Sequence, residues 1–253
     1  MSVYAVYFSP TGATEAVAMT IAGAMSQEVY SMNLCDREMK GDSLSLGAED
    51  ICILAAPAFG GRIPTASVER FQELSGNGAK AVLVATYGNR EYEDTMVELE
   101  DIALGCGFVV VAGIAAITEH SIAREFGAGR PNAEDVAVLK EFSLAILKKI
   151  KETKDLSVKI PGDRPYKTYG GASMTPKGNH KCVGCGACAK KCPVSAIPMD
   201  TPNQTNADVC IACMRCVSVC PMGARDLSKV MLLAVHQKLK KACSVPKENK
   251  LFL

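Results

Sequence analysis

Two runs of cysteine constrain this chain more than any other feature of its sequence. The first run is Cys182-x-x-Cys185-x-x-Cys188-x-x-x-Cys192-Pro193, and the second, with the same spacing, is Cys210-x-x-Cys213-x-x-Cys216-x-x-x-Cys220-Pro221. Three thiolates held this close can reach three corners of one four-iron cube, while the fourth cysteine of such a run normally ligates the other cluster. The spacing therefore predicts crossed ligand sets. The first cluster would be held by Cys182, Cys185, Cys188 and Cys220, and the second by Cys210, Cys213, Cys216 and Cys192.

A structural zinc site is the alternative for such cysteines. Zinc needs only four ligands, typically from paired Cys-x-x-Cys knuckles, so a triple run ending in Cys-Pro and occurring twice favours iron and sulfur. The stretch resembles a bacterial-type ferredoxin with two [4Fe–4S] clusters. Cys185 and Cys213, the middle cysteines, are both present, so the resemblance implies a full complement of iron in each cluster. Arg215 lies between two ligands of the second cluster; it would favour the reduced state there, unless its side chain points into water.

Composition narrows the setting of these cysteines. The chain has 253 residues, enough for more than one domain, and its 28 Lys+Arg against 27 Asp+Glu give no basic excess that would favour nucleic acid. The start, Met1-Ser2-Val3-Tyr4, shows no positively charged leader, and the longest apolar run, from Phe108 to Ile117, is too short to span a bilayer. We therefore expect a reducing cytoplasm, where thiolates survive to bind iron, and no membrane insertion. The four other cysteines, which we expect to be small buried or inert residues, are Cys35, Cys52, Cys106 and Cys243.

The N-terminus combines a strand, a hydroxyl-rich turn and a helix. Residues 3–8 are β-branched and aromatic, which suits a strand buried on both faces. Ser9-Pro10-Thr11-Gly12-Ala13-Thr14 follows, and a helical pattern runs from Glu15 to about Met25. Backbone N–H groups and the helix dipole at such a turn favour an anion, and this loop contains no lysine or arginine. The alternative is a simple N-cap made by Thr11 or Thr14.

The pattern of strands and helices continues to about residue 151. Strands are expected at 28–34, 51–56, 79–85 and 108–115, and helices at 65–74, 92–105 and 132–151, the last with Asn132 as N-cap. This alternation predicts a parallel, doubly wound α/β sheet that binds ligands at the carboxyl ends of its strands.

Two further loops should share that edge with the Ser/Thr-rich loop. Pro57-Ala58-Phe59-Gly60-Gly61-Arg62 follows one expected strand, and Thr86-Tyr87-Gly88-Asn89-Arg90-Glu91-Tyr92 follows the next. Each places glycine beside an aromatic ring, which would let backbone amides approach a flat redox-active ring system. Both could instead be ordinary turns.

Together these features resemble a flavodoxin that binds FMN. A flavodoxin-like domain joined to a two-cluster ferredoxin, with the segments at 119–121 and 129–135, resembles the EFR1-type ferrodoxin family. A mononucleotide suits the chain better than FAD, because no Gly-x-Gly-x-x-Gly turn follows a strand. The resemblance implies a phosphate site at Ser9, Thr11, Gly12, Ala13 and Thr14. It implies that Pro57, Phe59 and Gly60 flank one side of the flavin ring, and Tyr87, Gly88, Asn89 and Tyr92 the other.

Three charged or titratable residues near these loops keep two interpretations each. His120 is a weak candidate for a catalytic residue that supplies a proton to the flavin, or a hydrogen-bonded structural histidine beside Ser121. Arg62 and Arg90 would favour anionic reduced flavin, or face solvent.

We expect a flavodoxin-like FMN-binding α/β domain at 1–152, followed by a proline-stiffened linker or extended wrap at 153–178. A small α+β ferredoxin-like domain with two [4Fe–4S] clusters is expected at 179–226. A C-terminal helix and tail would occupy 227–253. The function expected is electron relay between the clusters and FMN, with redox proteins or small molecules as donor and acceptor. The alternatives are a flavin reductase of a small acceptor fed by the clusters, and a ferredoxin whose N-terminal domain only docks.

Overall fold

The larger part of the molecule is a parallel sheet covered by helices on both faces. The computed structural model describes residues 1–39, 44–170 and 174–253. Strands β1 (Val3–Tyr7), β2 (Val29–Asn33), β3 (Ile51–Pro57), β4 (Lys80–Tyr87) and β5 (Val109–Ile117) lie in the order β2-β1-β3-β4-β5 and are all parallel. This is the strand order of flavodoxin-like folds, so the predicted fold class is confirmed.

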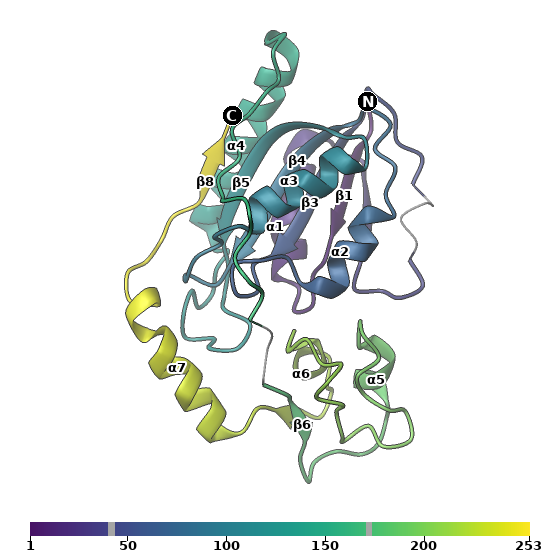
Figure 1. The fold of residues 1–253 in the computed structure, drawn as a ribbon, viewed down its shortest axis with the longest axis vertical. Coiled ribbons are helices and arrows are strands. Elements are labelled where there is room, and N and C mark those ends of the chain that lie inside the picture. Colours follow the sequence, from purple (N-terminus) through teal and green to yellow (C-terminus); the bar gives the residue numbers. More distant parts are fainter. Residues whose placement is uncertain (40–43, 171–173) are drawn as a thin grey trace.

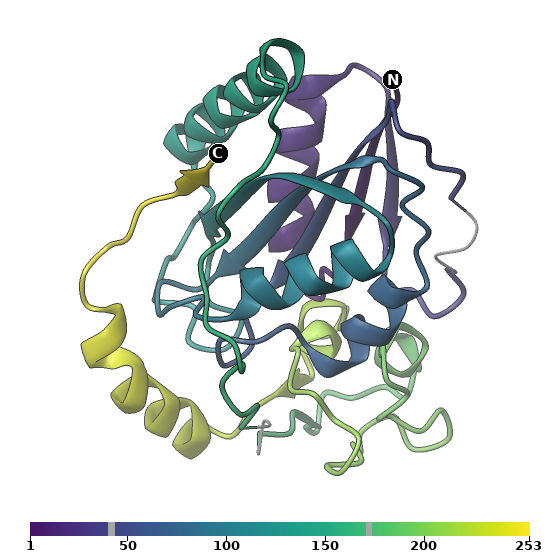
Figure 2. The same ribbon diagram turned by 45° about the horizontal axis from the view of Figure 1, so that its top comes forward.

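Alternation along the central strands explains why helices cover both faces. In β3, Ile53 packs toward α1 (Ala13–Met25) and α4 (Ala133–Glu152), whereas Leu54 packs toward α2 (Thr65–Gln72) and α3 (Thr95–Gly105). Figure 2 shows α1 and α4 on one face and α2 and α3 on the other. A strand buried on both sides has no polar face, which accounts for the unbroken apolar runs.

Helix ends follow the expected signals with one difference. Asn132 caps α4 in a capping box with Asp135, as its position predicted. Helix α3, however, begins at Thr95 rather than near Tyr92, because Glu93 has a φ of 42°, which no right-handed helix accommodates.

The stretch after α4 is an extended wrap. From residue 153 to residue 176 the described part contains no helix or strand; residues 171–173 of the expected linker lie outside the described residues. The wrap is attached to the N-terminal end of α3, where the Asp94 carboxylate accepts hydrogen bonds from the amides of Asp163 (2.9 Å) and Lys167 (2.8 Å). Ile160, a residue of the wrap, is buried in the hydrophobic core of the sheet part.

The cysteine-rich part is small and lies below the carboxyl edge of the sheet (Figure 1). It contains α5 (Ala187–Lys191), α6 (Arg215–Ser218) and a two-stranded antiparallel sheet of β6 (Lys177–Gly178) and β7 (Arg225–Asp226).

After β7 the chain returns to the large sheet. Helix α7 (Lys229–Cys243) leads from the cysteine-rich part back past the sheet edge (Figure 1), and β8 (Lys250–Phe252) adds to β5 as an antiparallel sixth strand. The helix was expected, but the strand was not. Across residues 1–39, 44–170 and 174–253, no helix combines the length and apolar character that a membrane crossing requires.

Candidate functional site

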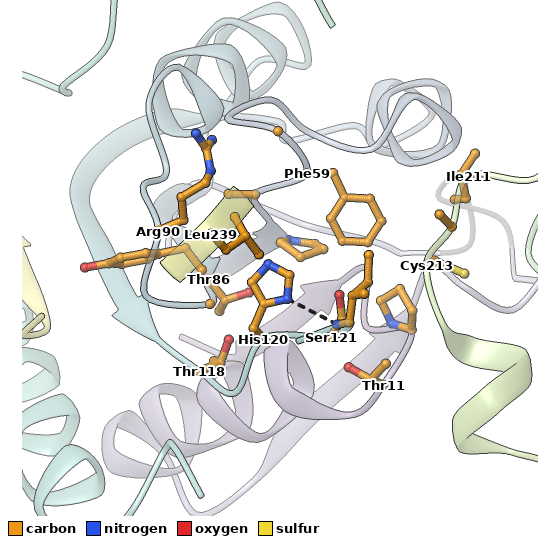
Figure 3. Close-up of a pocket in the computed structure, with 18 of the residues that line it drawn as sticks. Thr11, Phe59, Thr86, Arg90, Thr118, His120, Ser121, Ile211, Cys213 and Leu239 are labelled. Atoms are coloured by element: carbon orange, nitrogen blue, oxygen red, sulfur yellow. Dashed lines mark hydrogen bonds between the residues drawn. The ribbon is translucent and has the colours of Figure 1, made fainter. Parts of the chain in front are cut away.

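A cavity of about 460 Å³ lies at the carboxyl edge of the sheet. Its volume is in the range of about 300–1,000 Å³ that small-molecule sites occupy. Loops after β1, β3, β4 and β5 form one side, and residues of the wrap, the second cysteine run and α7 form the other. Figure 3 shows Thr11, Phe59, His120 and Cys213 around this space.

The loop after β1 presents free amides to the cavity. Gly12 has a φ of 93° and precedes α1, and Thr11, Ala13 and Thr14 line the cavity. Among the described residues, no acceptor pairs with the amides of Ala13 and Thr14, as expected for the first turn of a helix. This end of the cavity is suited to a phosphate group.

Two hydroxyls of this loop are already engaged. The Ser9 hydroxyl accepts a hydrogen bond from the amide of Glu15 (3.0 Å), and Ser9 is buried. The Thr14 hydroxyl pairs with that of Thr86 at 2.8 Å. Ser9 and Gly12 do not line the cavity, so Thr11 supplies the hydroxyl that is free to meet a ligand there.

An arginine from the cysteine-rich part reaches this same loop. The Nη1 atom of Arg215 donates to the carbonyl oxygen of Ser9 at 3.0 Å, and its Nε is buried with no partner among the described residues. The side chain thus does not point into water. It brings positive charge to a loop whose own sequence has none.

The loops after β3 and β4 form the middle of the cavity. Pro57, Phe59, Gly60, Tyr87 and Gly88 all line it. Gly88 is required for a reason other than ligand approach, since a Cβ atom there would lie 2.6 Å from the backbone of His120.

Two residues that the flavodoxin resemblance places beside the ring lie elsewhere. Tyr92 packs edge-on against Tyr87, with ring centroids 5.3 Å apart, and does not line the cavity. Asn89 binds the C-terminal segment: its Nδ2 donates to Cys243 O (2.9 Å) and Val245 O (3.0 Å), and its Oδ1 accepts from the Lys247 amide (2.9 Å).

His120 lines the cavity as a neutral imidazole. Its Nδ1 accepts from the amides of Ile122 (3.2 Å) and Ala123 (3.1 Å), so the proton of the neutral ring is on Nε2. The pKa of His120 is lowered to about 4, mainly by burial; the nearby Glu125 opposes this shift and Arg90 contributes to it. The ring is therefore a hydrogen-bond donor at neutral pH, held in one orientation.

The two arginines differ in position. Arg62 pairs with Glu98 at 2.7 Å, donates to Lys167 O and stacks on the Tyr166 ring, so it fastens the wrap and does not line the cavity. Arg90 does line the cavity and pairs with Glu93.

The far wall of the cavity was not predicted. It includes Tyr169 of the wrap, Ile211 and Cys213 of the second run, and Val235 and Leu239 of α7. Burial raises the pKa of Tyr169, and the neighbouring Cys213 thiol adds to the rise. No local pattern connects these residues, which come together only through the path of the chain.

The eight cysteines of the two runs surround two separate small cavities. One is lined by Cys182, Cys185, Cys188 and Cys220, and the other by Cys192, Cys210, Cys213 and Cys216. These are the crossed sets that the spacing predicts, although the binding of clusters by them stays a prediction. Among the described residues, no three potential ligands converge on a point that one metal ion could occupy. Four sulfurs around a shared space are the kind of donor set that a four-iron cluster requires.

The two runs repeat in conformation as well as in spacing. The amide of Ala196 donates to Cys192 Sγ at 3.3 Å, and the amide of Ala224 donates to Cys220 Sγ at 3.2 Å. Gly186 precedes α5 with a φ of 70°, and its counterpart Met214 precedes α6 with a φ of 60°. Amide hydrogen bonds of this kind stabilise the charge on cluster ligands.

The two cavities differ in exposure. At the first, Cys185 is exposed and Val183 and Met222 are 64% and 49% exposed. At the second, Cys213 and Cys216 are buried, and Cys213 also lines the large cavity. The second set therefore lies between the first set and the sheet edge.

Comparisons with known proteins agree with this description. Residues 181–224 match the family model described as "4Fe-4S dicluster domain". No curated protein sequence gives a match.

The chain is also similar to solved flavodoxins. That of Streptococcus pneumoniae TIGR4 is 19% identical, with 59% of this chain and 99% of that chain covered and a TM-score of 0.43. Flavodoxin 1 from Bacillus cereus is 21% identical, with 58% and 98% covered and a TM-score of 0.44. A flavodoxin from the domain Archaea is 17% identical, with 60% and 100% covered and a TM-score of 0.44. Strand order in the sheet and the matched cysteine runs make this chain a fusion of a flavodoxin-like α/β unit with a ferredoxin-type 4Fe-4S domain.

Proposed function

We propose that this chain is an electron-transfer flavo-iron–sulfur protein that relays electrons between two [4Fe–4S] clusters and one FMN. The observation that carries the proposal is the position of Cys213. This residue belongs to the second ligand set and also lines the cavity that contains the anion-binding loop and Phe59. When bound, each cluster would exchange one electron and the flavin one or two.

The cavity has what FMN needs. The free amides beside Thr11, Ala13 and Thr14 would hold the phosphate, with Arg215 adding positive charge through its contact with Ser9. Phe59 and the adjoining glycine loop would lie against the ring, and the Nε2–H of His120 would donate to it. Tyr169, Val235 and Leu239 would cover the side facing the cysteine-rich part and exclude water.

The first ligand set is the surface for exchange with a partner. Cys185 is exposed beside Val183 and Met222, so a redox protein could approach the first cluster closely. The flavin site is covered by the wrap and α7 and is less accessible to a protein. Electrons would therefore pass between the partner and the first cluster, between the first and second clusters, and between the second cluster and the flavin, in either direction.

We further propose that the chain belongs to the EFR1-type ferrodoxin family and acts in the cytoplasm, in anaerobic redox metabolism. Support comes from the joined flavodoxin-like and dicluster parts and from eight clustered thiols, which persist in a reducing compartment. Its partners would be redox proteins or small electron donors and acceptors.

The test begins with anaerobic purification and quantification of iron, sulfide and FMN. The clusters are then reduced in a stopped-flow instrument while the flavin absorbance is followed at several protein concentrations. A relay within one chain gives a rate that does not depend on protein concentration. The matched control is the FMN-loaded protein lacking its clusters, mixed with a separate reduced two-cluster ferredoxin. If the intact chain is no faster than this mixture, the relay proposal fails.

A second candidate is a flavin reductase of a small acceptor, and the observation that favours it is His120. A neutral donor held in one orientation inside the cavity is suited to contact a substrate as well as a flavin. Single-turnover oxidation of the reduced protein by small acceptors distinguishes the two. A rate that saturates with acceptor concentration and falls in His120→Asn supports the reductase, whereas the relay requires neither.

A further inference from the structure

The two cysteine runs differ at one buried position that follows each of them. The first run continues to Ala196 and Ile197, and the second continues to Ala224 and Arg225. Because both alanine amides donate to the preceding cysteine sulfur, Ile197 and Arg225 occupy equivalent places in the repeat. Ile197 is 4% exposed and Arg225 is 2% exposed. The second repeat thus has a cation where the first has an aliphatic residue.

Arg225 has no carboxylate partner within residues 1–39, 44–170 and 174–253. Its guanidinium donates to the carbonyl oxygens of Pro176 (2.8 Å), Pro202 and Gln204 and to the hydroxyl of Thr205. All of these acceptors are neutral, and Nε has no partner among the described residues. A buried cation without an opposite charge is costly, by several kcal/mol or more. Negative charge is therefore expected beside it in the functional protein.

The groups that can supply this negative charge are cluster ligands from both sets. Nη1 of Arg225 lies 3.9 Å from Sγ of Cys188, which belongs to the first set. Arg225 also donates to Pro176 O (2.8 Å) and to the Thr205 hydroxyl, and both of these residues line the cavity of the second set together with Cys216. The guanidinium is thus located between the two sets.

We propose that Arg225 is a shared counterion of the two clusters, which raises the reduction potentials of both. Each cluster gains one negative charge on reduction, and the first reduction disfavours the second by repulsion at low dielectric. A fixed cation between them stabilises both reduced states and offsets this repulsion. The protein could then hold two electrons at once, the number that FMN accepts in full reduction. This inference rests on the two clusters of the proposed function.

The test compares Arg225→Met and Arg225→Lys with the wild type in redox titrations followed by electron paramagnetic resonance (EPR). Methionine keeps much of the buried apolar stem and removes the charge, whereas lysine keeps the charge. For Arg225→Met we expect the reduced-to-oxidised ratio of each cluster at a given potential to fall at least tenfold, about 59 mV for a one-electron couple. Both potentials should therefore fall in the same direction. Arg225→Lys should lie between Arg225→Met and the wild type.

The matched control is Lys177→Met. Lys177 is exposed and lies opposite Asp226 in the two-stranded sheet of β6 and β7, so the variant removes one positive charge on the solvent side. Solvent screens such a charge, and both potentials should stay at their wild-type values. If Arg225→Met assembles both clusters and also keeps these values, Arg225 only holds the chain together and the inference is overturned.

A second measurement keeps the Arg225 side chain in place, and it covers the case in which Arg225→Met does not assemble its clusters. Wild-type protein labelled with ¹⁵N-arginine should show a ¹⁵N coupling to the reduced first cluster in pulsed EPR, because Arg225 Nη1 lies 3.9 Å from Cys188 Sγ, and labelled Arg225→Lys should lose it. Absence of the coupling in the wild type overturns the inference. Iron analysis separates the two levels: a chain without two four-iron clusters refutes the proposed function and this inference together, and two clusters without the coupling refute this inference alone.

Discussion

The Nη1 atom of Arg215 donates a hydrogen bond to the carbonyl oxygen of Ser9 over 3.0 Å. Arg215 begins α6 between two predicted cluster ligands, and Ser9 precedes the loop whose amides face the large cavity. Arg70 and Arg37 cross the same boundary in the other direction, to Pro193 O and to the Ser195 hydroxyl. The ferredoxin-type and flavodoxin-like parts are therefore joined at the place where electrons would pass in the proposed relay.

Replacing Arg215 by methionine should weaken FMN binding. The variant removes a cation and a hydrogen bond that positions the phosphate loop, a loss of about 0.5–1.5 kcal/mol, or roughly three- to tenfold in Kd. Quenching of FMN fluorescence on titration with flavin-free protein measures it. Lys148→Met, on the exposed side of α4, is the control and should leave Kd unchanged. An unaltered Kd in Arg215→Met would show that the contact is structural only.

Removing Cys220 should damage the cluster of the other run. Cys220 lines the same cavity as Cys182, Cys185 and Cys188, so Cys220→Ala should lose the first cluster and keep the second. Cys192→Ala should do the reverse. Iron analysis and EPR of the reduced proteins distinguish the two, with Cys106→Ala in the sheet part as the control. Loss of only the second signal in Cys220→Ala would contradict the crossed assignment.

The sheet and the cysteine sets could be predicted because their signals are local. Strand β3 is a continuous apolar run, and α4 begins at an N-cap followed by a capping partner. The second cysteine run, the 12 residues from Cys210 to Pro221, repeats the spacing of the first run. Periods, caps and spacings of this kind can be recognised in one window of sequence. The strands that were missed, β6, β7 and β8, have only two or three residues each.

The shared wall of the cavity could not be predicted, because its contacts join distant parts of the chain. Ser9 and Arg215 are 206 positions apart, and Asn89 meets Cys243 across 154. Nothing near Asn89 in the sequence indicates that its amide holds the C-terminal segment rather than a ligand. The repeat places Ile197 and Arg225 at equivalent positions, but nothing near Arg225 in the sequence indicates that its side chain is buried beside Cys188.

Histidine 120 should make the protein less stable as the pH falls below neutrality. Burial lowers its pKa to about 4, from 6.5. Between pH 6.5 and about pH 4 the unfolded chain binds a proton at this ring and the folded chain does not. The free energy of unfolding therefore decreases as the pH decreases. The loss should be about 2 kcal/mol between pH 7 and pH 5. Urea unfolding followed by circular dichroism measures it.

His120→Asn is the informative variant for this prediction. An asparagine Oδ1 can accept from the amides two and three residues ahead, as Nδ1 of His120 does with Ile122 and Ala123. The variant should therefore fold and lose this component of the pH dependence. His180→Asn, at an exposed position, should keep it. Equal pH profiles for His120→Asn and the wild type would mean that the ring is protonated in the folded protein.

Asparagine 89 should control the attachment of the C-terminal segment. In Asn89→Asp the acceptor for the Lys247 amide remains, but the donors to Cys243 O and Val245 O are lost and a carboxylate faces two carbonyl oxygens. We expect the free energy of unfolding to fall by roughly 2–4 kcal/mol. Amide hydrogen exchange in β8 should become faster. Asn77→Asp is a matched control, because Asn77, like Asn89, has a positive φ (49° against 60°) and a side-chain amide that donates to a backbone carbonyl oxygen, that of Leu46. It should leave exchange in β8 unchanged. If Asn89→Asp instead abolishes FMN binding with normal exchange in β8, Asn89 contacts the flavin, as the flavodoxin resemblance implies.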